Sequence, residues 1–154
     1  YRILLAGGGT GGHIYPLIAV SKELQKIASE KGVDLELLAL ADSLSWRGEF
    51  ENSSIRFKKI MTPKFRQVEG GRINFFNFLK IPVALLQSLW VLFIFMPDLV
   101  FSKGGLASVI PSFVARLYFI PIFIHESDSV PGAANKFIAW VAKKIFISFE
   151  NSAA

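Results

Sequence analysis

Short apolar runs alternate with longer segments of helical periodicity along the chain. Several of these runs are apolar without alternation, which is typical of strands covered by helices on both faces. The pattern predicts βαβ units and an α/β, Rossmann-like, mostly parallel sheet with helices on both faces. The expected strands lie near Arg2–Ala6, Asp34–Leu40, Arg56–Ile60, Leu99–Ser102, Pro121–His125 and Lys144–Ser148. The expected helices lie near Ile14–Ser29, Phe75–Met96, Val109–Tyr118 and Ala133–Ala142.

Length and composition indicate one domain. With 154 residues, 52% of them hydrophobic, the chain can bury a sizeable core. We expect the domain to cover residues 1–150, because no linker or second composition block follows the last expected strand. Zero cysteines and two histidines exclude a disulfide framework and nearly every zinc-ligand arrangement, so we expect neither metal nor cofactor.

The most apolar segment, Ile81–Met96, follows a group of basic residues. A net charge of +5 would suit nucleic acid, but these cations are dispersed and lie beside apolar side chains, which favours an anionic membrane surface and no nucleic acid. A helix of 16 residues spans roughly 24 Å, less than the roughly 30 Å of a bilayer core, unless it extends back to Phe75. Two alternatives stay open, a buried crossover helix of the sheet and a helix that is part core and part membrane-facing. The basic residues are Lys58, Lys59, Lys64, Arg66, Arg72 and Lys80.

A glycine-rich segment, Gly7–Gly12, separates the first expected strand from the first helix. Its backbone can approach a ligand closely, and the helix start presents N–H groups to a phosphate or diphosphate. The spacing of Gly7, Gly9 and Gly12 also satisfies a dinucleotide motif, with Asp42 as the ribose acid about thirty residues further on. A purely structural turn is a third possibility. A Walker A loop is excluded, because histidine stands where its lysine is needed.

His13 follows this loop at the start of the expected helix. A lone histidine is more often a packed or capping residue than a catalyst. The positive end of a helix, however, lowers the pKa of an imidazole and favours the neutral form that can accept a proton. The position therefore makes His13 a candidate general base.

A second loop, Gly104-Gly105, follows a strand and precedes Ser108, which we expect to cap the next helix, with Lys103 nearby. Carboxyl ends of neighbouring parallel strands share one edge of a sheet, so both glycine loops should face one crevice. The pair His125-Glu126 ends another expected strand near the same edge. For Glu126 a direct role and a role in orienting its loop are equally open.

Four ordered motifs resemble the MurG family of glycosyltransferases and cover nearly all of the chain. The basic turn Lys64-Phe65-Arg66 matches the position of a basic loop in the family. The other three motifs are the first glycine loop, Gly8–His13 with Pro16 and Ala19; the second, Pro97–Gly105 with Ser108; and Ile120–Glu126 followed by Val130-Pro131-Gly132 and Asn135-Lys136. The resemblance implies the amino-terminal, acceptor-binding half of a two-domain GT-B enzyme whose carboxyl-terminal donor-binding domain is absent from this chain.

The same resemblance implies inverting transfer of N-acetylglucosamine from UDP-N-acetylglucosamine to lipid I, forming lipid II in peptidoglycan synthesis. The enzyme would be peripheral, at the cytoplasmic face of the cell membrane, and the isolated chain would bind its acceptor weakly and be inactive. Alternatives are the acceptor subunit of another, or split, lipid-linked-sugar glycosyltransferase and a non-catalytic nucleotide- or diphosphate-binding module.

The resemblance also assigns roles to residues. His13 is implied as the general base, with Glu126 as a second catalytic candidate. Leu106 and Ile110 depart from the family's second loop, and Asp128 stands where asparagine is usual. An aspartate accepts but does not donate a hydrogen bond, so its contact to the donor sugar would change. The implied substrate-binding residues are Thr10, Gly11 and Gly12 at the junction of acceptor and donor, Gly104, Gly105 and Ser108 at the acceptor diphosphate, and Asp128 and Asn135 near the sugar.

Overall fold

The computed structural model describes residues 1–63 and 78–150 and contains a six-stranded sheet in the order β3-β2-β1-β4-β5-β6. Every pairing in this sheet is parallel. The Rossmann-like prediction is therefore confirmed, whereas the basic turn Lys64-Phe65-Arg66 lies outside the described residues. The strands are β1 (Arg2–Gly7), β2 (Glu36–Ala41), β3 (Arg56–Lys59), β4 (Leu99–Gly104), β5 (Ile122–Glu126) and β6 (Lys144–Ile147).

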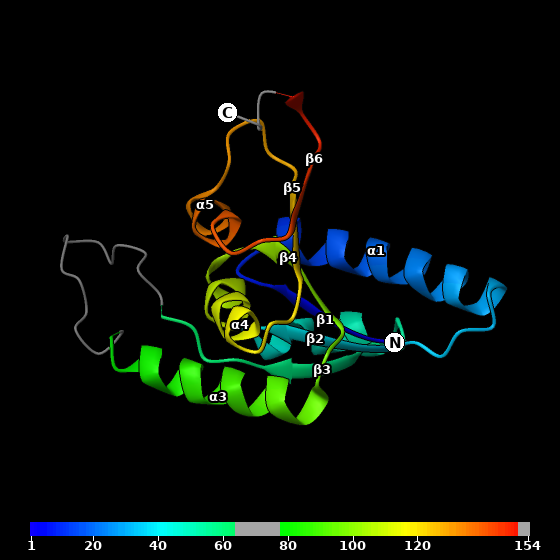
Figure 1. Cartoon of the computed structure of the whole chain (residues 1–154), viewed down its shortest axis with the longest axis horizontal. Helices are drawn as coiled ribbons and strands as arrows, with labels where there is room; N and C mark the ends of the chain where they lie inside the picture. The colour runs from blue at the N-terminus through cyan, green and yellow to red at the C-terminus, as the bar shows by residue number, and fades with distance from the viewer. Residues whose placement is uncertain (64–77, 151–154) are drawn as a thin grey trace.

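Helices cover both faces of the sheet (Figure 1). Successive residues of β1 point to opposite faces, so Leu4 packs in the core beneath α3, α4 and α5, while Leu5 packs beneath α1 and α2. Both cores are built from buried aliphatic side chains, which explains why the strands lack polar alternation. The helices are α1 (Gly11–Glu30), α2 (Arg47–Glu51), α3 (Lys80–Phe95), α4 (Leu106–Leu117) and α5 (Ala133–Ala139), with a 3-10 turn at Leu44–Trp46.

Helix α1 begins three residues earlier than the predicted start at Ile14, because Gly11, Gly12 and His13 already form its first turn. Glycine has a low helix propensity, so the sequence pattern placed both glycines in the loop. The glycine loop proper is therefore Gly8–Thr10.

The segment Leu44–Glu51, for which the sequence pattern predicts no element, is helical. Its buried Phe50 stacks on Phe57 of β3, with ring centroids 5.9 Å apart. The sequence did hold a signal, since Ser43 caps the turn through the Ser45 N–H and the pair Arg47–Glu51 has helical spacing.

Helix α3 is neither fully buried nor long enough to span a bilayer. Only one stripe of it is buried, formed by Ala84, Ser88, Leu92 and Phe95, and most of its other apolar side chains are exposed. The alternative of a wholly buried crossover helix is therefore wrong. Residues 78 and 79 form a turn, so the helix begins at Lys80, and the expected start at Phe75 lies outside the described residues. Across the described ranges, no helix has both the length and the apolar composition of a membrane span.

Candidate functional site

The two glycine loops lie in direct contact, as the crevice prediction requires. Strands β1 and β4 are neighbours, and Gly7 is in register with Gly104 where both strands end. Gly105 has a φ of +80°, and a Cβ added to it would lie 2.5 Å from the carbonyl oxygen of Gly8. Only a residue without a side chain permits this approach, so the glycines bring the starts of α1 and α4 together.

Helices α1 and α4 both begin within a few residues of this contact. The first-turn N–H groups of a helix have no partner within it, so Gly11 and Gly12 can donate to an anion. Ser108 is not the cap of α4 as expected, because the helix begins at Leu106 after Gly105. The buried hydroxyl of Ser108 lies in the first turn and donates to the Gly105 carbonyl at 2.8 Å. It therefore holds the second loop in shape.

His13 is half-buried and lies next to Thr10, whose hydroxyl oxygen is 3.3 Å from His13 Nδ1. Burial and the positive charge of Lys103 lower the pKa of His13 below its ordinary value of 6.5. A hydrogen bond with the Gly8 backbone and the carboxylates of Asp128 and Glu126 act in the opposite direction, but more weakly. The neutral imidazole is thus favoured near neutral pH, as a proton acceptor requires.

A hollow of about 240 Å³ lies beside the His13 ring. It brings together candidates from three parts of the chain, namely the start of α1, the second glycine loop and the segment after β5. Thr10, Gly11, Gly12, Gly104 and Ser108 do not line this hollow, although they adjoin residues that do. The lining residues are His13, Gly105, Leu106, Glu126, Asp128, Gly132, Ala133, Ala134 and Asn135.

The Glu126 carboxylate organises the loop that follows β5. Its Oε1 accepts from the Asp128 N–H at 3.0 Å, and its Oε2 accepts from the Gly132 N–H at 3.0 Å and from Asn135 Nδ2 at 2.9 Å. Burial raises the pKa of Glu126, but these hydrogen bonds together with Lys103 outweigh it, so the net pKa is lowered. Both carboxylate oxygens of Glu126 accept hydrogen bonds from the segment that follows β5. This favours a role for Glu126 in orienting the loop, and Asn135, as one of the donors, has the same role.

Lys103 is a site residue whose surroundings the sequence did not reveal. It is 2% exposed, and its Nζ donates to Ser127 Oγ at 2.8 Å. Burial lowers the pKa of Lys103, against the opposing effect of Glu126 and Asp128. No local pattern could have found this contact, because it joins residues 24 positions apart.

Asp42, at the end of β2, belongs to the first glycine loop. Its Oδ1 accepts from the Gly9 N–H at 3.0 Å. The Asp42 carboxylate therefore already accepts from a backbone N–H group of the loop that a dinucleotide diphosphate would need. This geometry does not support Asp42 as a ribose-binding acid.

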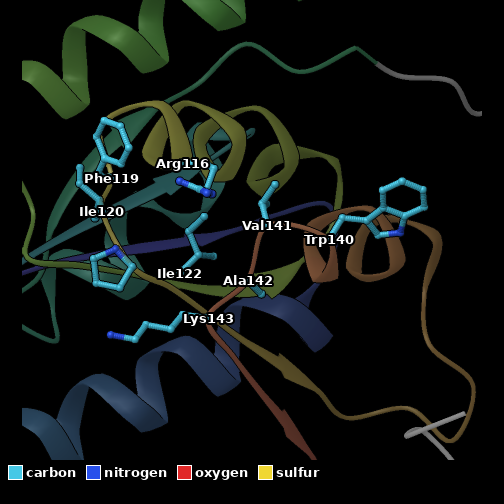
Figure 2. A pocket seen from close by; sticks show the side chains of 9 residues that line it. Arg116, Phe119, Ile120, Ile122, Trp140, Val141, Ala142 and Lys143 are labelled. Atoms are coloured by element: carbon cyan, nitrogen blue, oxygen red, sulfur yellow. The ribbon is translucent and has the colours of Figure 1, made fainter.

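A second hollow, of about 420 Å³, lies at the other end of β5, near Ile120 and Ile122. Figure 2 shows the side chains of Arg116, Lys143 and Trp140 around it. It contains none of the predicted site residues.

The sequence model of the glycosyltransferase family 28 N-terminal domain matches residues 3–147. Two curated relatives carry the name UDP-N-acetylglucosamine–N-acetylmuramyl-(pentapeptide) pyrophosphoryl-undecaprenol N-acetylglucosamine transferase. The relative from Thermotoga sp. (strain RQ2) is 37% identical over 154 residues, covering 98% of this chain and 44% of the relative. The relative from Treponema pallidum (strain Nichols) is 37% identical over 150 residues, covering 97% of this chain and 38% of the relative. The chain thus spans about two fifths of the length of these relatives.

Solved structures agree with this assignment. The crystal structure of Acinetobacter baumannii MurG superposes with a TM-score of 0.79 at 28% identity, over 98% of this chain and 42% of that one. A UDP-GlcNAc 2-epimerase from Neisseria meningitidis shares the fold alone, with a TM-score of 0.66 at 14% identity over 99% of this chain and 41% of the other. These findings confirm the resemblance to the MurG family. The chain belongs to the N-terminal domain family of the family 28 glycosyltransferases, and it has the fold of the amino-terminal half of a GT-B enzyme.

Proposed function

We propose that this domain is the acceptor-binding half of an enzyme that transfers N-acetylglucosamine from UDP-N-acetylglucosamine to lipid I, forming lipid II. Family membership and the names of the relatives support the reaction class. The observation that carries the proposal is the contact between Gly105 and Gly8 beside the His13 ring, because it unites two anion-binding helix starts with a proton acceptor.

In the proposed reaction the C4 hydroxyl of the muramoyl sugar attacks the anomeric carbon of the donor. A carbon–oxygen bond forms on the face opposite to UDP, so the configuration inverts. UDP departs with the electron pair of the broken bond, and a ring nitrogen of His13 takes the hydroxyl proton. If the Nδ1–H donates to Thr10, whose hydroxyl is 3.3 Å away, Nε2 is left as the acceptor.

The acceptor diphosphate would lie against the glycine loops. The N–H groups of Gly11 and Gly12 at the start of α1, and those at the start of α4 beyond Gly104-Gly105, supply donors and partial positive charge. Asp128 lines the same hollow and would accept from a sugar hydroxyl. We propose that this arrangement needs no metal, because backbone donors serve the diphosphate.

The exposed face of α3 would lie on an anionic membrane. Leu86 is 67% exposed and Trp90 is 64% exposed, so the helix presents a continuous apolar surface to solvent. The hollow in Figure 2 is lined by two cations, Arg116 and Lys143, together with Trp140, a combination suited to anionic headgroups. We propose peripheral attachment at the cytoplasmic face, where the lipid-linked acceptor would be reached.

A donor-binding domain would complete the site. Strand β6 forms one edge of the sheet and exposes Ile145, Phe146 and Ile147, an apolar surface of the kind that a packed partner covers. Most UDP contacts would come from that domain, so we expect the isolated 154 residues to bind acceptor weakly without turnover.

The test compares His13→Ala with the unmodified complete protein, including its donor-binding half, in transfer of labelled N-acetylglucosamine to lipid I. We expect kcat to fall by about 10²- to 10⁴-fold, with acceptor affinity nearly unchanged. An unchanged rate with intact folding would instead favour a non-catalytic diphosphate-binding module. Turnover by the isolated domain would contradict the assignment of the donor contacts.

A further inference from the structure

A buried lysine directly precedes the second glycine loop, and the proposed reaction assigns it no step. Lys103, in β4, is 2% exposed, and its ammonium donates to a neutral hydroxyl, that of Ser127, at 2.8 Å. Burying an ammonium group costs free energy unless its surroundings compensate. Buried ionisable groups in a cleft are more frequent at functional sites than elsewhere.

We propose that Lys103 is a positioning residue with two effects on the site: it anchors the loop after β5 through Ser127, whose neighbours Glu126 and Asp128 line the same hollow as His13, and it holds a buried positive charge next to that hollow. The catalytic part of this inference rests on the function proposed above. The effect on His13 itself does not.

The anchoring effect follows from the position of Ser127 between two other site residues. On one side Glu126 holds the backbone of the loop by accepting from the Asp128 N–H. On the other side Lys103 reaches from β4 and donates to the Ser127 hydroxyl. The turn that presents Asp128 to the hollow is thereby tied to two strands, β4 and β5.

The electrostatic effect follows from the charges that face His13. The end of β4 contributes Lys103, the end of β5 contributes Glu126, and the following loop contributes Asp128. The two carboxylates favour the imidazolium, whereas Lys103, together with burial of the ring, disfavours it and lowers the pKa of His13. Without the lysine charge only burial of the ring would oppose the carboxylates, and His13 would take up its proton at a higher pH.

The decisive experiment follows the ring resonances of His13 by NMR during a pH titration of the complete protein. Lys103→Met removes the charge with little change in length, and Lys103→Arg keeps the charge. Lys22→Met removes an exposed lysine from α1 and is the matched control. Lys103 also lowers the pKa of His125, so a His125→Gln background assigns the signals.

We expect the midpoint of His13 to move to higher pH in Lys103→Met, and to stay near its original value in Lys103→Arg and Lys22→Met. The acid limb of the pH profile of kcat/KM should move to higher pH by the same amount. At a given pH on that limb, kcat/KM then falls about tenfold for each pH unit of displacement. A shifted midpoint with an unmoved acid limb would leave the inference intact and refute His13 as the base. An unchanged midpoint in folded Lys103→Met, or an equal shift in Lys103→Arg, would overturn the inference.

Ser127→Ala tests the anchoring effect and remains informative if Lys103→Met does not fold. It removes the hydroxyl acceptor and keeps the charge. We expect KM for the donor, UDP-N-acetylglucosamine, to rise several-fold, with kcat and the His13 midpoint retained. An unaltered KM would show that Lys103 does not act through Ser127.

Discussion

Gly105 lies so close to Gly8 that a Cβ on Gly105 would be 2.5 Å from the Gly8 carbonyl oxygen. Its φ of +80° adds strain for any residue with a side chain. We therefore expect Gly105→Ala to lower the free energy of unfolding by about 2–4 kcal/mol and to weaken acceptor binding, because the two loops must separate. Urea unfolding and acceptor titration measure the two effects.

Two other glycines allow the cost of backbone strain to be measured apart from the cost of the contact between the two loops. Gly32 has a φ of +62° with open space around it, so Gly32→Ala should cost only about 1–2 kcal/mol. Gly48 lies in α2 with open space and no positive φ, so Gly48→Ala should be neutral or stabilising by up to about 1 kcal/mol. A Gly105→Ala cost no larger than that of Gly32→Ala would argue against the inter-loop contact.

Acidification should destabilise the domain through its two histidines. Burial and Lys103 lower the pKa values of His13 and His125 below 6.5, so the unfolded chain takes up protons at a higher pH than the folded one. The free energy of unfolding should therefore decline as pH falls below about 6.5. The double variant His13→Gln/His125→Gln should flatten this decline in denaturant titrations between pH 7 and 5, and a slope equal to that of the parent would contradict the prediction.

Removing the charge of Glu126 should loosen the loop that follows β5. In Glu126→Gln an amide N–H₂ would face one of the donors from Asp128, Gly132 or Asn135, so we expect a loss of about 1–3 kcal/mol near neutral pH. The pKa of Glu126 is lowered, so its stabilising effect is present above about 4.5 and disappears as pH falls through the folded-state pKa. The variant should lose that acid dependence in thermal unfolding, whereas Glu23→Gln, an exposed change on α1, should keep it.

The exposed face of α3 should bind vesicles without contributing to folding. We expect Leu86→Asp to reduce cosedimentation with vesicles that contain anionic lipid and to leave the unfolding free energy nearly unchanged. Leu92→Ala, on the buried stripe of the same helix, should cost about 2–5 kcal/mol and leave vesicle binding intact when folded. Equal vesicle binding by Leu86→Asp and the parent would refute the membrane-facing assignment.

The sequence predicted the strands of the sheet better than the start of helix α1. Apolar composition marks the buried strands, such as β1 and β4, and all six strands were located to within a few residues, although β6 is exposed. Their parallel arrangement then placed both glycine loops at one edge, and the contact at Gly105 agrees. The start of α1 was missed because Gly11 and Gly12 carry no side-chain pattern.

The candidate site was predicted from local motifs, so the contacts between its residues that are distant in the sequence were not predicted. His13 and Glu126 stand out by residue type and position, yet the three donors to Glu126 become visible only when its loop is folded. The sequence places Lys103 beside the second glycine loop but does not predict its burial or its contact with Ser127 in the segment after β5. Contacts of this kind leave no periodic trace in the sequence.

The hydrogen bond from the Gly9 N–H to Asp42 makes the two sides of the first glycine loop chemically different. A fixed negative charge occupies the β2 side of the loop and repels any anionic group that approaches there. On the β4 side Gly8 meets Gly105, which lines the same hollow as His13. We therefore expect a bound diphosphate to lie on that side of the turn, because the carboxylate repels it from the other.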